Sequence, residues 1–358
     1  MKANNDRLEQ EMQLLESDLL DKVDPLKYSL LSHQQLIQLP IPPTQWISGM
    51  LIPNPGLVAI SGKPGSYKTF FAIWLGLRAG MGKPLFEEHD EPFFSDELAT
   101  APMGKVPTLF VEEENTKQTM KERALGFYGF GSAPVDDMFY LVDEGFKFTD
   151  ERWRNELIRI IEERGIKLLI VDPFSSVMGL DNENDNAEVS RVMDLVRKEF
   201  IKRDITVILI HHPSKGDGDG KNLRGAGDIL GKCDVHLCLE VENEMEKIIR
   251  VSYQKLRVAD RSKVSDFRIR LAGDSGLQDL RFRYIGTAKP AYQEERDELA
   301  AEILKNMADD EEYAQKELAT LVGQKSNNSK FVAAWKQLVI EKKINQNITT
   351  KKFYKYQK

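Results

Sequence analysis

The sequence lacks long apolar runs and is poor in cysteine. A membrane-spanning helix needs about 20 consecutive, mostly apolar residues, and no run in this chain approaches that length. The first residues are polar and charged, so we expect no secretory signal. The only cysteines, Cys233 and Cys238, lack the paired spacing of a zinc site or redox dithiol, and we expect two reduced core thiols. These absences predict a cytoplasmic protein with no membrane partner.

The composition is that of a globular protein, but its charge is unevenly distributed. With 41% hydrophobic and 30% charged residues among 358, the chain can form one large domain and a small one. The net charge is −7, yet residues 313–358 hold ten lysines against Glu317 and Glu341. This tail therefore carries +8 and the preceding residues −15. The asymmetry predicts that the tail meets a polyanion that the rest of the chain would repel.

Residues 61–69, Ser-Gly-Lys-Pro-Gly-Ser-Tyr-Lys-Thr, form the most informative stretch. An apolar segment of strand length, 56–60, precedes it, and residues 70–77 have the pattern of a buried helix. Strand, glycine-containing loop, Lys-Thr and helix is the order of a phosphate-binding loop, in which backbone N–H groups converge on phosphate at a helix N-terminus. We therefore expect ATP and Mg²⁺ as cofactors. The expected nucleotide contacts are Gly62, Lys63, Pro64, Gly65, Ser66, Tyr67, Lys68, Thr69 and Phe70.

One position departs from the phosphate-loop pattern. The pattern has glycine directly before the lysine, and this chain has Tyr67. A side chain there must point away from the nucleotide or cover it. An ordinary glycine-rich turn between strand and helix is the alternative interpretation, so other residues must decide.

The first two thirds of the chain alternate strands and helices. Apolar strands are expected at 106–111, 138–142, 167–172 and 206–212, and helices at 116–128, 151–164 and 187–202. This alternation predicts an α/β fold with a mostly parallel sheet covered by helices on both faces. Strands at 235–241, 248–255, 267–272 and 280–284, joined by short polar turns, predict antiparallel hairpins at the end of the sheet.

Two segments outside this alternation are also predictable. Residues 5–23 form an expected helix with a narrow apolar stripe of Leu8, Met12, Leu15 and Leu19. The stripe either packs on its own domain or docks on a neighbouring subunit. Prolines between residues 40 and 55 indicate an extended approach to the first strand, and residues 83–105 a surface insertion.

Polar residues follow the predicted parallel strands, where ligands bind in such sheets. Asp172 is placed to hold magnesium through water while Thr69 ligates it directly. Glu114 is placed to activate the attacking water, whereas Glu112 and Glu113 fit solvated acids better. His212 is placed to sense the γ-phosphate, although a histidine before proline can be structural.

Together these residues resemble a RecA-fold ATPase, and within that group the RepA and DnaB-type hexameric helicase branch of plasmid and phage AAA-family ATPases. The resemblance spans about residues 45–285. It is carried by the loop 62–69, Phe110-Val111-Glu112-Glu113-Glu114, Ile170-Val171-Asp172-Pro173, His211-His212-Pro213-Ser214-Lys215, Leu223-Arg224-Gly225-Ala226-Gly227-Asp228 and Lys255-Leu256-Arg257.

The resemblance implies roles for single residues. In that family the glutamate after the second strand activates water, and the nine-residue spacing to Arg123 identifies it as Glu114. A histidine three residues before a lysine senses phosphate, which fits His212 with Lys215, and His211 is the runner-up. Lys255 and Arg257 would reach the nucleotide of the neighbouring subunit in a ring, unless Arg257 is only a solvated strand residue. The glycine-rich stretch 215–224 would contact single-stranded DNA in the channel through Lys221 and Arg224, or be merely a mobile loop.

The basic tail has the pattern of a winged helix. Helices are expected at 291–308, 315–322 and 328–341, followed by a hairpin at 344–349 and 353–356. In such a domain the second helix of the turn and the wing can reach DNA phosphates. Protein docking, or simple solvation of the lysines, is the alternative. The expected DNA contacts are Lys330, Lys336, Lys351 and Lys352.

The sequence thus predicts three parts: a helical arm and linker at 1–44, a RecA-like ATPase core at 45–288 and a winged-helix-like basic domain at 289–358. The expected protein is an ATP-hydrolysing homo-oligomer, in a hexameric ring, that acts on DNA as a helicase. A DNA-bound regulatory or loader ATPase is the second hypothesis. A degenerate nucleotide-binding scaffold is the third, and Tyr67 is its main evidence.

Overall fold

The computed structural model describes residues 30–41, 43–86, 104–128, 135–180, 185–211, 231–273, 279–289, 291–308 and 311–355. The expected helix at 5–23, most of the insertion at 83–105, and His212, Lys221 and Arg224 lie outside these residues. Residue contacts divide the chain into two units, 1–43 and 44–358. The described part of the first unit holds one short helix, α2 (His33–Ile37), with Ser32 and Gln35 forming a capping box at its start.

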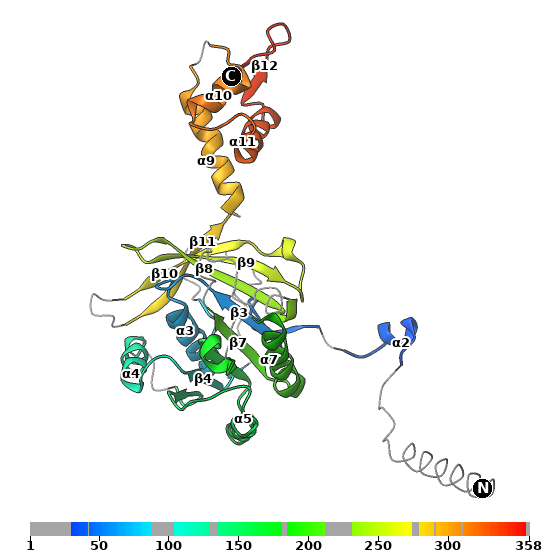
Figure 1. Cartoon of the computed structure of the whole chain (residues 1–358), viewed down its shortest axis with the longest axis vertical. Helices are drawn as coiled ribbons and strands as arrows, with labels where there is room; N and C mark the ends of the chain where they lie inside the picture. Colours follow the sequence, from blue (N-terminus) through cyan, green and yellow to red (C-terminus); the bar gives the residue numbers. More distant parts are fainter. Residues whose placement is uncertain are drawn as a thin grey trace, which may run out of the picture. The chain divides into compact units, whose positions relative to one another are not determined.

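The second unit is built on a nine-stranded sheet in the order β11-β10-β9-β8-β3-β7-β6-β4-β5 (Figure 1). Strands β5, β4, β6, β7, β3 and β8 run parallel, and β8 to β11 are antiparallel neighbours. The predicted α/β fold with a mostly parallel sheet is therefore confirmed. The strands are β3 (Leu57–Ser61), β4 (Thr108–Glu112), β5 (Met138–Val142), β6 (Leu168–Asp172), β7 (Thr206–His211), β8 (Val235–Asn243), β9 (Ile248–Leu256), β10 (Asp266–Ala272) and β11 (Arg281–Ala288).

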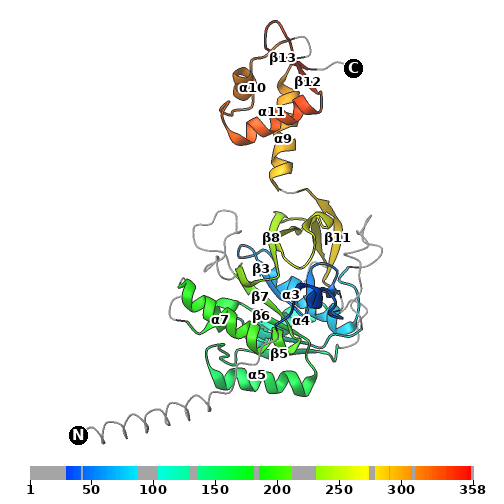
Figure 2. The same ribbon diagram turned by 90° about the vertical axis from the view of Figure 1, so that its right-hand side faces the viewer.

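Both faces of the parallel part are covered by helices (Figures 1 and 2). Strands β3, β4, β6 and β7 are buried at every residue, as expected for strands whose alternate side chains enter two separate cores. Helices α3 (Lys68–Met81) and α4 (Lys117–Gly126) contribute to the core on one face. Helices α5 (Glu151–Arg164), α6 (Phe174–Met178) and α7 (Asn186–Glu199) contribute to the core on the other.

The helix boundaries follow from capping residues. Thr116, Asp150 and Asp185 accept backbone hydrogen bonds at the N-termini of α4, α5 and α7. Gly165 ends α5 with φ 63°, in the left-handed region that glycine enters most readily. These local signals explain why the predicted helix positions agree closely with the structure.

Several short elements of the structure, among them a hairpin before the main sheet and a helix after β6, were not predicted. Residues 45–54, expected as an extended approach, instead form an antiparallel hairpin of β1 (Gln45–Ser48) and β2 (Ile52–Asn54). Its apolar residues Ile47, Leu51 and Ile52 join the core that α3 covers. Helix α6, which follows directly after Asp172-Pro173, was also missed. The hairpin therefore extends the core ahead of the first strand of the main sheet.

The C-terminal elements form a core of their own. They are α9 (Ala291–Asn306), α10 (Gln315–Leu321), α11 (Ser329–Ile340), β12 (Ile344–Gln346) and β13 (Phe353–Lys355). Ile303, Leu318 and Phe331 are fully buried in this core. Tyr313 pairs with Phe353 through two backbone hydrogen bonds of 2.8 Å and so lies beside the hairpin. Three helices and a hairpin are the elements predicted for a winged helix, whereas the domain boundary at residue 288 stays a prediction.

Helix α9 is joined to the main sheet by ion pairs. The Glu294 carboxylate contacts Arg250 of β9 and, at 2.8 Å, Arg268 of β10. Glu242 of β8 contacts the same two arginines at 3.1 and 2.5 Å. Arg250 is only 4% exposed, so these carboxylates compensate a buried charge.

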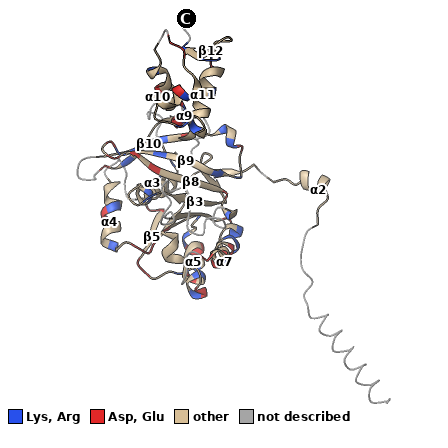
Figure 3. Ribbon diagram, turned by 45° about the horizontal axis from the view of Figure 1, so that its top comes forward, with Lys and Arg blue, Asp and Glu red and all other residues tan. Residues whose placement is uncertain are grey.

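Charged residues of both signs alternate over the outer helices, as the ribbon around α5 and α7 shows (Figure 3). On α5, Arg159 pairs with both Glu156 and Glu163.

None of the helices within the described residues is both long and apolar enough to span a membrane.

Candidate functional site

The loop between β3 and α3 has glycine where the backbone demands it. Gly62 has φ 153°, and a Cβ on it would lie 2.3 Å from the carbonyl oxygen of Leu239. Gly65 has φ 82° and open space around it, so its conformation, not crowding, requires glycine. The loop therefore passes tightly against β8 before it turns into α3.

Tyr67 occupies the left-handed region that glycine would favour. Its φ and ψ are 62° and 21°, and it is the N-cap residue of α3 without any side-chain capping bond. Its half-buried ring packs edge-on against Phe70 at 6.2 Å between centroids. The glycine of the usual pattern thus meets a backbone requirement, which this chain satisfies with a tyrosine. The sequence left two directions open to this side chain, away from the nucleotide or over it. The contact with Phe70 favours a ring that packs on α3.

Lys68 folds back onto the loop that precedes it. Its Nζ donates to the carbonyl oxygens of Gly62 at 2.7 Å and Lys63 at 2.9 Å. Burial lowers the pKa of Lys68 to about 8, although Asp172, Cys238 and Glu114 act in the opposite direction. A buried, positively charged amine at the N-terminus of a helix is suited to receive an anion.

Thr69 at the start of α3 and Asp172 at the end of β6 are in contact, although 103 residues separate them. The Thr69 hydroxyl donates to Asp172 Oδ2 at 2.6 Å. Burial and the nearby Glu112 raise the pKa of Asp172 to about 7, against the effect of Thr69, Lys68 and Arg123. The structure thus brings together the two side chains predicted to hold magnesium.

Glu112 was interpreted wrongly. The sequence favoured a solvated acid, but Glu112 is fully buried at the end of β4 and lies beside Asp172 in the register of β4 and β6. Its Oε1 accepts from the backbone N–H groups of Glu114 and Asn115, both at 2.9 Å, and from Asn115 Nδ2 at 3.1 Å. Burial raises the pKa of Glu112. No local feature distinguishes it from the two acids that follow, because its burial depends on strand register.

The next two acids have different environments. Glu113 is half-buried, and its carboxylate accepts from the backbone N–H groups of Gly145 at 2.9 Å and Phe146 at 3.0 Å. It is a structural residue that fixes the loop after β5. Glu114 is exposed at the same edge of the sheet as the phosphate-binding loop, and its charge acts on Lys68.

Asn115 connects this acidic turn to α4. Its Oδ1 accepts from Arg123 Nη2 at 3.2 Å, while its amide nitrogen donates to Glu112. Arg123 also stacks over the ring of Phe70 at 5.7 Å. The arginine that follows Glu114 by nine residues is therefore held between the acidic turn and α3.

A buried histidine pair lies at the end of β7 and in β8. Ser61 Oγ lies 2.8 Å from Nε2 of His236. Burial lowers the pKa of His236 to about 4, and His211 and Lys255 act in the same direction. His211, the runner-up phosphate sensor, is 1% exposed and packs against Phe174. The preferred sensor, His212, lies outside the described residues.

Lys255 and Arg257 lie at the opposite edge of the sheet from the phosphate-binding loop. Leu256 pairs with Val235 at the start of β8, whereas Ser61 pairs with Cys238 three residues later. At about 3.3 Å per residue the separation along the strands is about 10 Å. Burial and then Arg257 lower the pKa of Lys255.

The side chains of this Lys-Leu-Arg segment are anchored on neighbouring backbone. Both Lys255 and Arg257 donate to the carbonyl oxygen of Gly231, the lysine at 3.0 Å. Asp234 lies 3.8 Å from Arg257. This arrangement keeps both cations away from the phosphate-binding loop of their own chain.

The four lysines expected to contact DNA do not share one environment. Lys330 pairs with Glu295 of α9 at 2.5 Å. Lys336 and Lys351 are exposed, and Lys352 is half-buried, with its charge acting on Glu312. Only Lys336 and Lys351 therefore extend into solvent without such acidic neighbours in the described residues.

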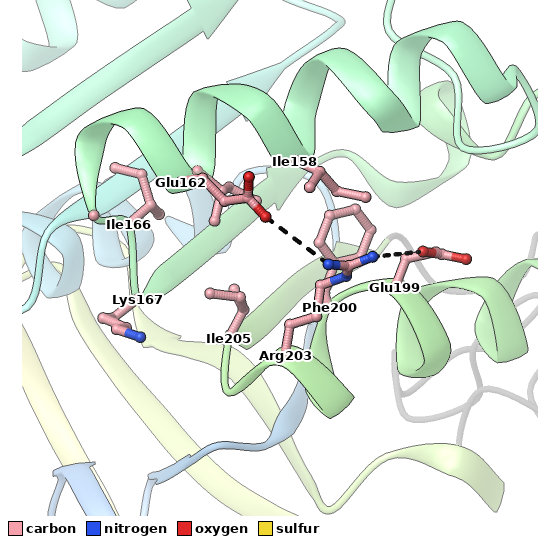
Figure 4. Close-up of a pocket in the computed structure, with 10 residues that line it drawn as sticks. Ile158, Glu162, Ile166, Lys167, Glu199, Phe200, Arg203 and Ile205 are labelled. Carbon is pink, nitrogen blue, oxygen red and sulfur yellow. Dashed lines mark ion pairs between the residues drawn. The ribbon is translucent and has the colours of Figure 1, made fainter.

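A separate cavity of about 200 Å³ lies between the C-terminal ends of α5 and α7 (Figure 4). Apolar and charged side chains line this cavity. Among them, the Arg203 guanidinium lies between two carboxylates, 3.9 Å from Glu162 and 3.7 Å from Glu199. Ile166 and Ile205, which precede β6 and β7, place it at the edge of the sheet opposite to Asp172. The cavity is therefore not part of the phosphate site.

The described residues contain no group of three or more His, Cys, Asp or Glu side chains arranged to hold a metal. A magnesium ion fits this site only as Mg²⁺ usually binds with nucleotides, by one or two protein oxygens together with phosphate oxygens and water. Thr69, Asp172 and the unpartnered Oε2 of buried Glu112 offer such oxygens.

Comparison with known proteins agrees with this geometry. No curated protein matches the sequence significantly. The family model described as "AAA domain" matches residues 22–218, which is more than half of the chain and includes the phosphate-binding loop, the acidic turn and Asp172. Families with this loop bind nucleoside triphosphates, typically with Mg²⁺. The chain therefore belongs to the AAA domain family, on a RecA-like P-loop fold.

Proposed function

We propose that this chain is an ATP-hydrolysing motor that assembles as a ring, in a hexamer, and acts on DNA. The observation that carries the proposal is the hydrogen bond of 2.6 Å between Thr69 and Asp172, beside a Lys68 amine held in the loop. A hydroxyl and a carboxylate at one position are the groups needed for the magnesium of a bound nucleotide. A turn without nucleotide function gives no reason for a buried lysine and aspartate at this position.

In this proposal Glu114 activates the attacking water and His212 senses the γ-phosphate. Glu114 is exposed at the edge of the sheet where the loop lies, and its charge acts on Lys68. An acid that accepts a proton from water must be accessible to it, as Glu114 is and Glu112 is not.

The ring is proposed because Lys255 and Arg257 lie away from their own nucleotide loop. The register of β8 and β9 places them at the other edge of the sheet. A cation supplied in trans can neutralise charge in the transition state and increases the rate about 10³- to 10⁵-fold in other phosphate-cleaving systems. Arg257 is half exposed and can meet a neighbouring subunit.

DNA is the proposed polymer, with single strands in the channel contacted by Lys221 and Arg224. Duplex contacts would come from Lys336 and Lys351 of the C-terminal elements, with Lys330 and Lys352 nearer to acids of their own domain. Strand displacement, as in the RepA and DnaB branch, is the activity that we propose for the assembled ring.

The experiment compares ATP hydrolysis by the wild type and by Lys68→Ala, Glu114→Gln and Arg257→Ala, with single-stranded DNA. Each variant is expected to lose at least about 100-fold in kcat, since each removes a separate part of the site. Glu114→Gln retains ATP binding. An equal mixture of the Lys68→Ala and Arg257→Ala chains recovers activity at about a quarter of the sites, if subunits exchange at random in a ring.

The mixture separates a shared site from a self-contained one. No recovery, with subunit exchange shown independently, would contradict the ring with sites between subunits. Hydrolysis at wild-type rate in both Lys68→Ala and Glu114→Gln would contradict the nucleotide site itself. Arg159→Ala is the matched control, because this exposed arginine pairs with Glu156 and Glu163 on the surface of α5.

One observation favours a second function. Tyr67 stands where the usual phosphate loop has glycine, and this substitution suits a nucleotide-binding scaffold that hydrolyses ATP slowly or not at all. Measurable hydrolysis stimulated by DNA excludes the scaffold. Hydrolysis without strand displacement identifies a regulatory or loader ATPase instead.

A further inference from the structure

Glu112 has the geometry of a prearranged ligand, although the sequence gives it no role. Its Oε1 accepts three hydrogen bonds, from Glu114 N, Asn115 N and Asn115 Nδ2, at 2.9 to 3.1 Å. These donors belong to the turn after β4, and the Asn115 side chain is in turn held by Arg123. The carboxylate is therefore fixed in place by its neighbours.

The second oxygen of the same carboxylate has no such partner. Glu112 Oε2 is buried and accepts no hydrogen bond from any described residue, and the whole side chain is 0% exposed. A buried carboxylate oxygen without a donor is unfavourable, because neither water nor protein replaces its lost hydration. Such an oxygen is expected where a ligand completes the site.

The position of Glu112 identifies the class of ligand. Glu112 and Asp172 are paired residues of the parallel strands β4 and β6, so their side chains leave the sheet on the same face. Thr69, at the start of α3, contacts Asp172 on that face. One hydroxyl and two carboxylates thus converge beside the phosphate-binding loop, where oxygen donors suit a hard divalent cation.

We propose that Glu112 is an additional protein group of the magnesium site, donating Oε2 toward the hydrated ion that Thr69 and Asp172 hold with a bound nucleotide. The inference rests on the proposed function. It differs from the proposed role of Glu114 in activating water, because the carboxylate of Glu114 is exposed and its backbone N–H donates to Glu112. Oε1 keeps the turn in place, and Oε2 supplies charge to the ion.

The experiment measures Mn²⁺ binding by electron paramagnetic resonance, with the full-length protein and a non-hydrolysable ATP analogue. Glu112→Gln keeps the shape and an Oε1 that accepts the same three hydrogen bonds, but it removes the charge. We expect its Mn²⁺ affinity to fall about 10- to 100-fold, the range for groups that support a metal site. Analogue affinity measured in EDTA is expected to be unchanged. Glu163→Gln, which neutralises a surface carboxylate on α5, is the matched control and is expected to bind Mn²⁺ like the wild type.

Wild-type Mn²⁺ affinity in Glu112→Gln would overturn the proposal and leave Glu112 as an acceptor for the turn alone. If Glu112→Gln does not fold, Glu112→Asp keeps the charge but withdraws it by one methylene. A reduced Mn²⁺ affinity then supports the proposal and an unchanged one overturns it. Failure of the wild type itself to bind the analogue with Mn²⁺ would instead contradict the proposed function.

Discussion

At the residue scale, Tyr67 combines a backbone cost with a side-chain gain. A non-glycine residue in the left-handed region is disfavoured by roughly 1–2 kcal/mol. The ring of Tyr67 offsets part of this cost by packing against Phe70, which in turn contacts Phe127 and lies under Arg123. The residue before Lys68 is therefore fixed by contacts rather than left flexible.

The two effects are separable with a pair of substitutions. Tyr67→Ala loses the ring and keeps the unfavourable backbone, whereas Tyr67→Gly loses the ring and relieves it. We therefore expect Tyr67→Gly to be more stable than Tyr67→Ala by about 1 kcal/mol, measured by urea denaturation. This sign is opposite to that expected inside a helix, where glycine is the less stable of the two.

Gly165 provides the matched control. It has φ 63° and no atom within 4 Å of an added Cβ, so Gly165→Ala isolates the backbone cost at the end of α5. It is expected to destabilise the protein by about 1 kcal/mol. Equal stabilities of Tyr67→Gly and Tyr67→Ala would show that the left-handed conformation of residue 67 costs nothing.

The residues of the site were only partly predictable from the sequence. Lys68, Thr69 and Asp172 carry local signals, since each stands at the end of an apolar strand or directly after a glycine-containing loop. Glu112 has no such signal among three successive acids. Its burial depends on the register of β4 against β6 and on the donors of Asn115, which are tertiary facts.

At the element scale, the ends of β4 and β6 and the start of α3 enclose charges that would otherwise be hydrated. Asp172 and Glu112 are buried side by side, and Lys68 is buried at the start of α3. Burial raises the pKa of Asp172 to about 7 and lowers the pKa of Lys68 to about 8. Both shifts make the metal-free folded protein less stable near pH 7 to 8 than it would be with unshifted groups.

The raised pKa of Asp172 predicts how the stability of the protein depends on pH. Between its unfolded pKa of 3.8 and its folded pKa of about 7, the folded chain binds a proton that the unfolded chain has lost. Stability contributed by Asp172 is thus present at low pH and decreases as pH rises, by up to about 1.4 kcal/mol per pH unit. We expect Asp172→Asn to flatten the decrease in unfolding free energy between pH 5 and pH 7, measured by urea denaturation in EDTA.

Lys68 contributes in a different window and provides the control. Its folded pKa of about 8 lies below the unfolded 10.5, so its penalty is present below pH 8 and disappears as pH rises toward 10.5. Lys68→Met is therefore expected to change the slope above pH 8. Because Lys68 lowers the pKa of Asp172, this variant keeps the decrease between pH 5 and pH 7 and extends it above pH 7, whereas Asp172→Asn flattens it. Identical curves for Asp172→Asn and wild type would contradict the buried aspartate.

Most helices and strands of the main sheet could be predicted from the sequence, and each missed element has a physical reason. Fully apolar strands alternating with capped helices carry their own signal, and β5 and α5 have the predicted bounds. The β1–β2 hairpin was missed because Pro53 and the following Pro55 indicated an extended chain, although Ile47 and Ile52 are core residues. The five-residue α6 is too short to show a helical period.

At the scale of the whole molecule, the charge asymmetry is partly compensated within the C-terminal elements. Residues 291–312 contain nine acids against Arg296 and Lys305 and directly precede the +8 tail. Lys330 pairs with Glu295, and Glu312 accepts hydrogen bonds from Asn347 and Thr350 next to Lys352. Net charge of the tail alone therefore overstates the field that a polyanion meets.

This compensation predicts which lysines bind duplex DNA, if that domain binds it. The double variant Lys336→Ala, Lys351→Ala removes two exposed cations, one on α11 and one in the wing. We expect weaker duplex binding and a slope of log affinity against log salt that is smaller by about 2, roughly one for each phosphate contact. Fluorescence anisotropy from 50 to 200 mM salt measures both.

Lys330→Ala is the matched control for the DNA prediction. Because Lys330 already pairs with Glu295 on α9, its removal is expected to change the salt slope much less than the double variant does. An unchanged affinity and slope in the double variant would exclude these lysines as phosphate contacts. The exposed apolar side chains of Ile340 and Ile348 on the same elements would then favour a protein partner, because apolar surface contributes little to contacts with phosphates.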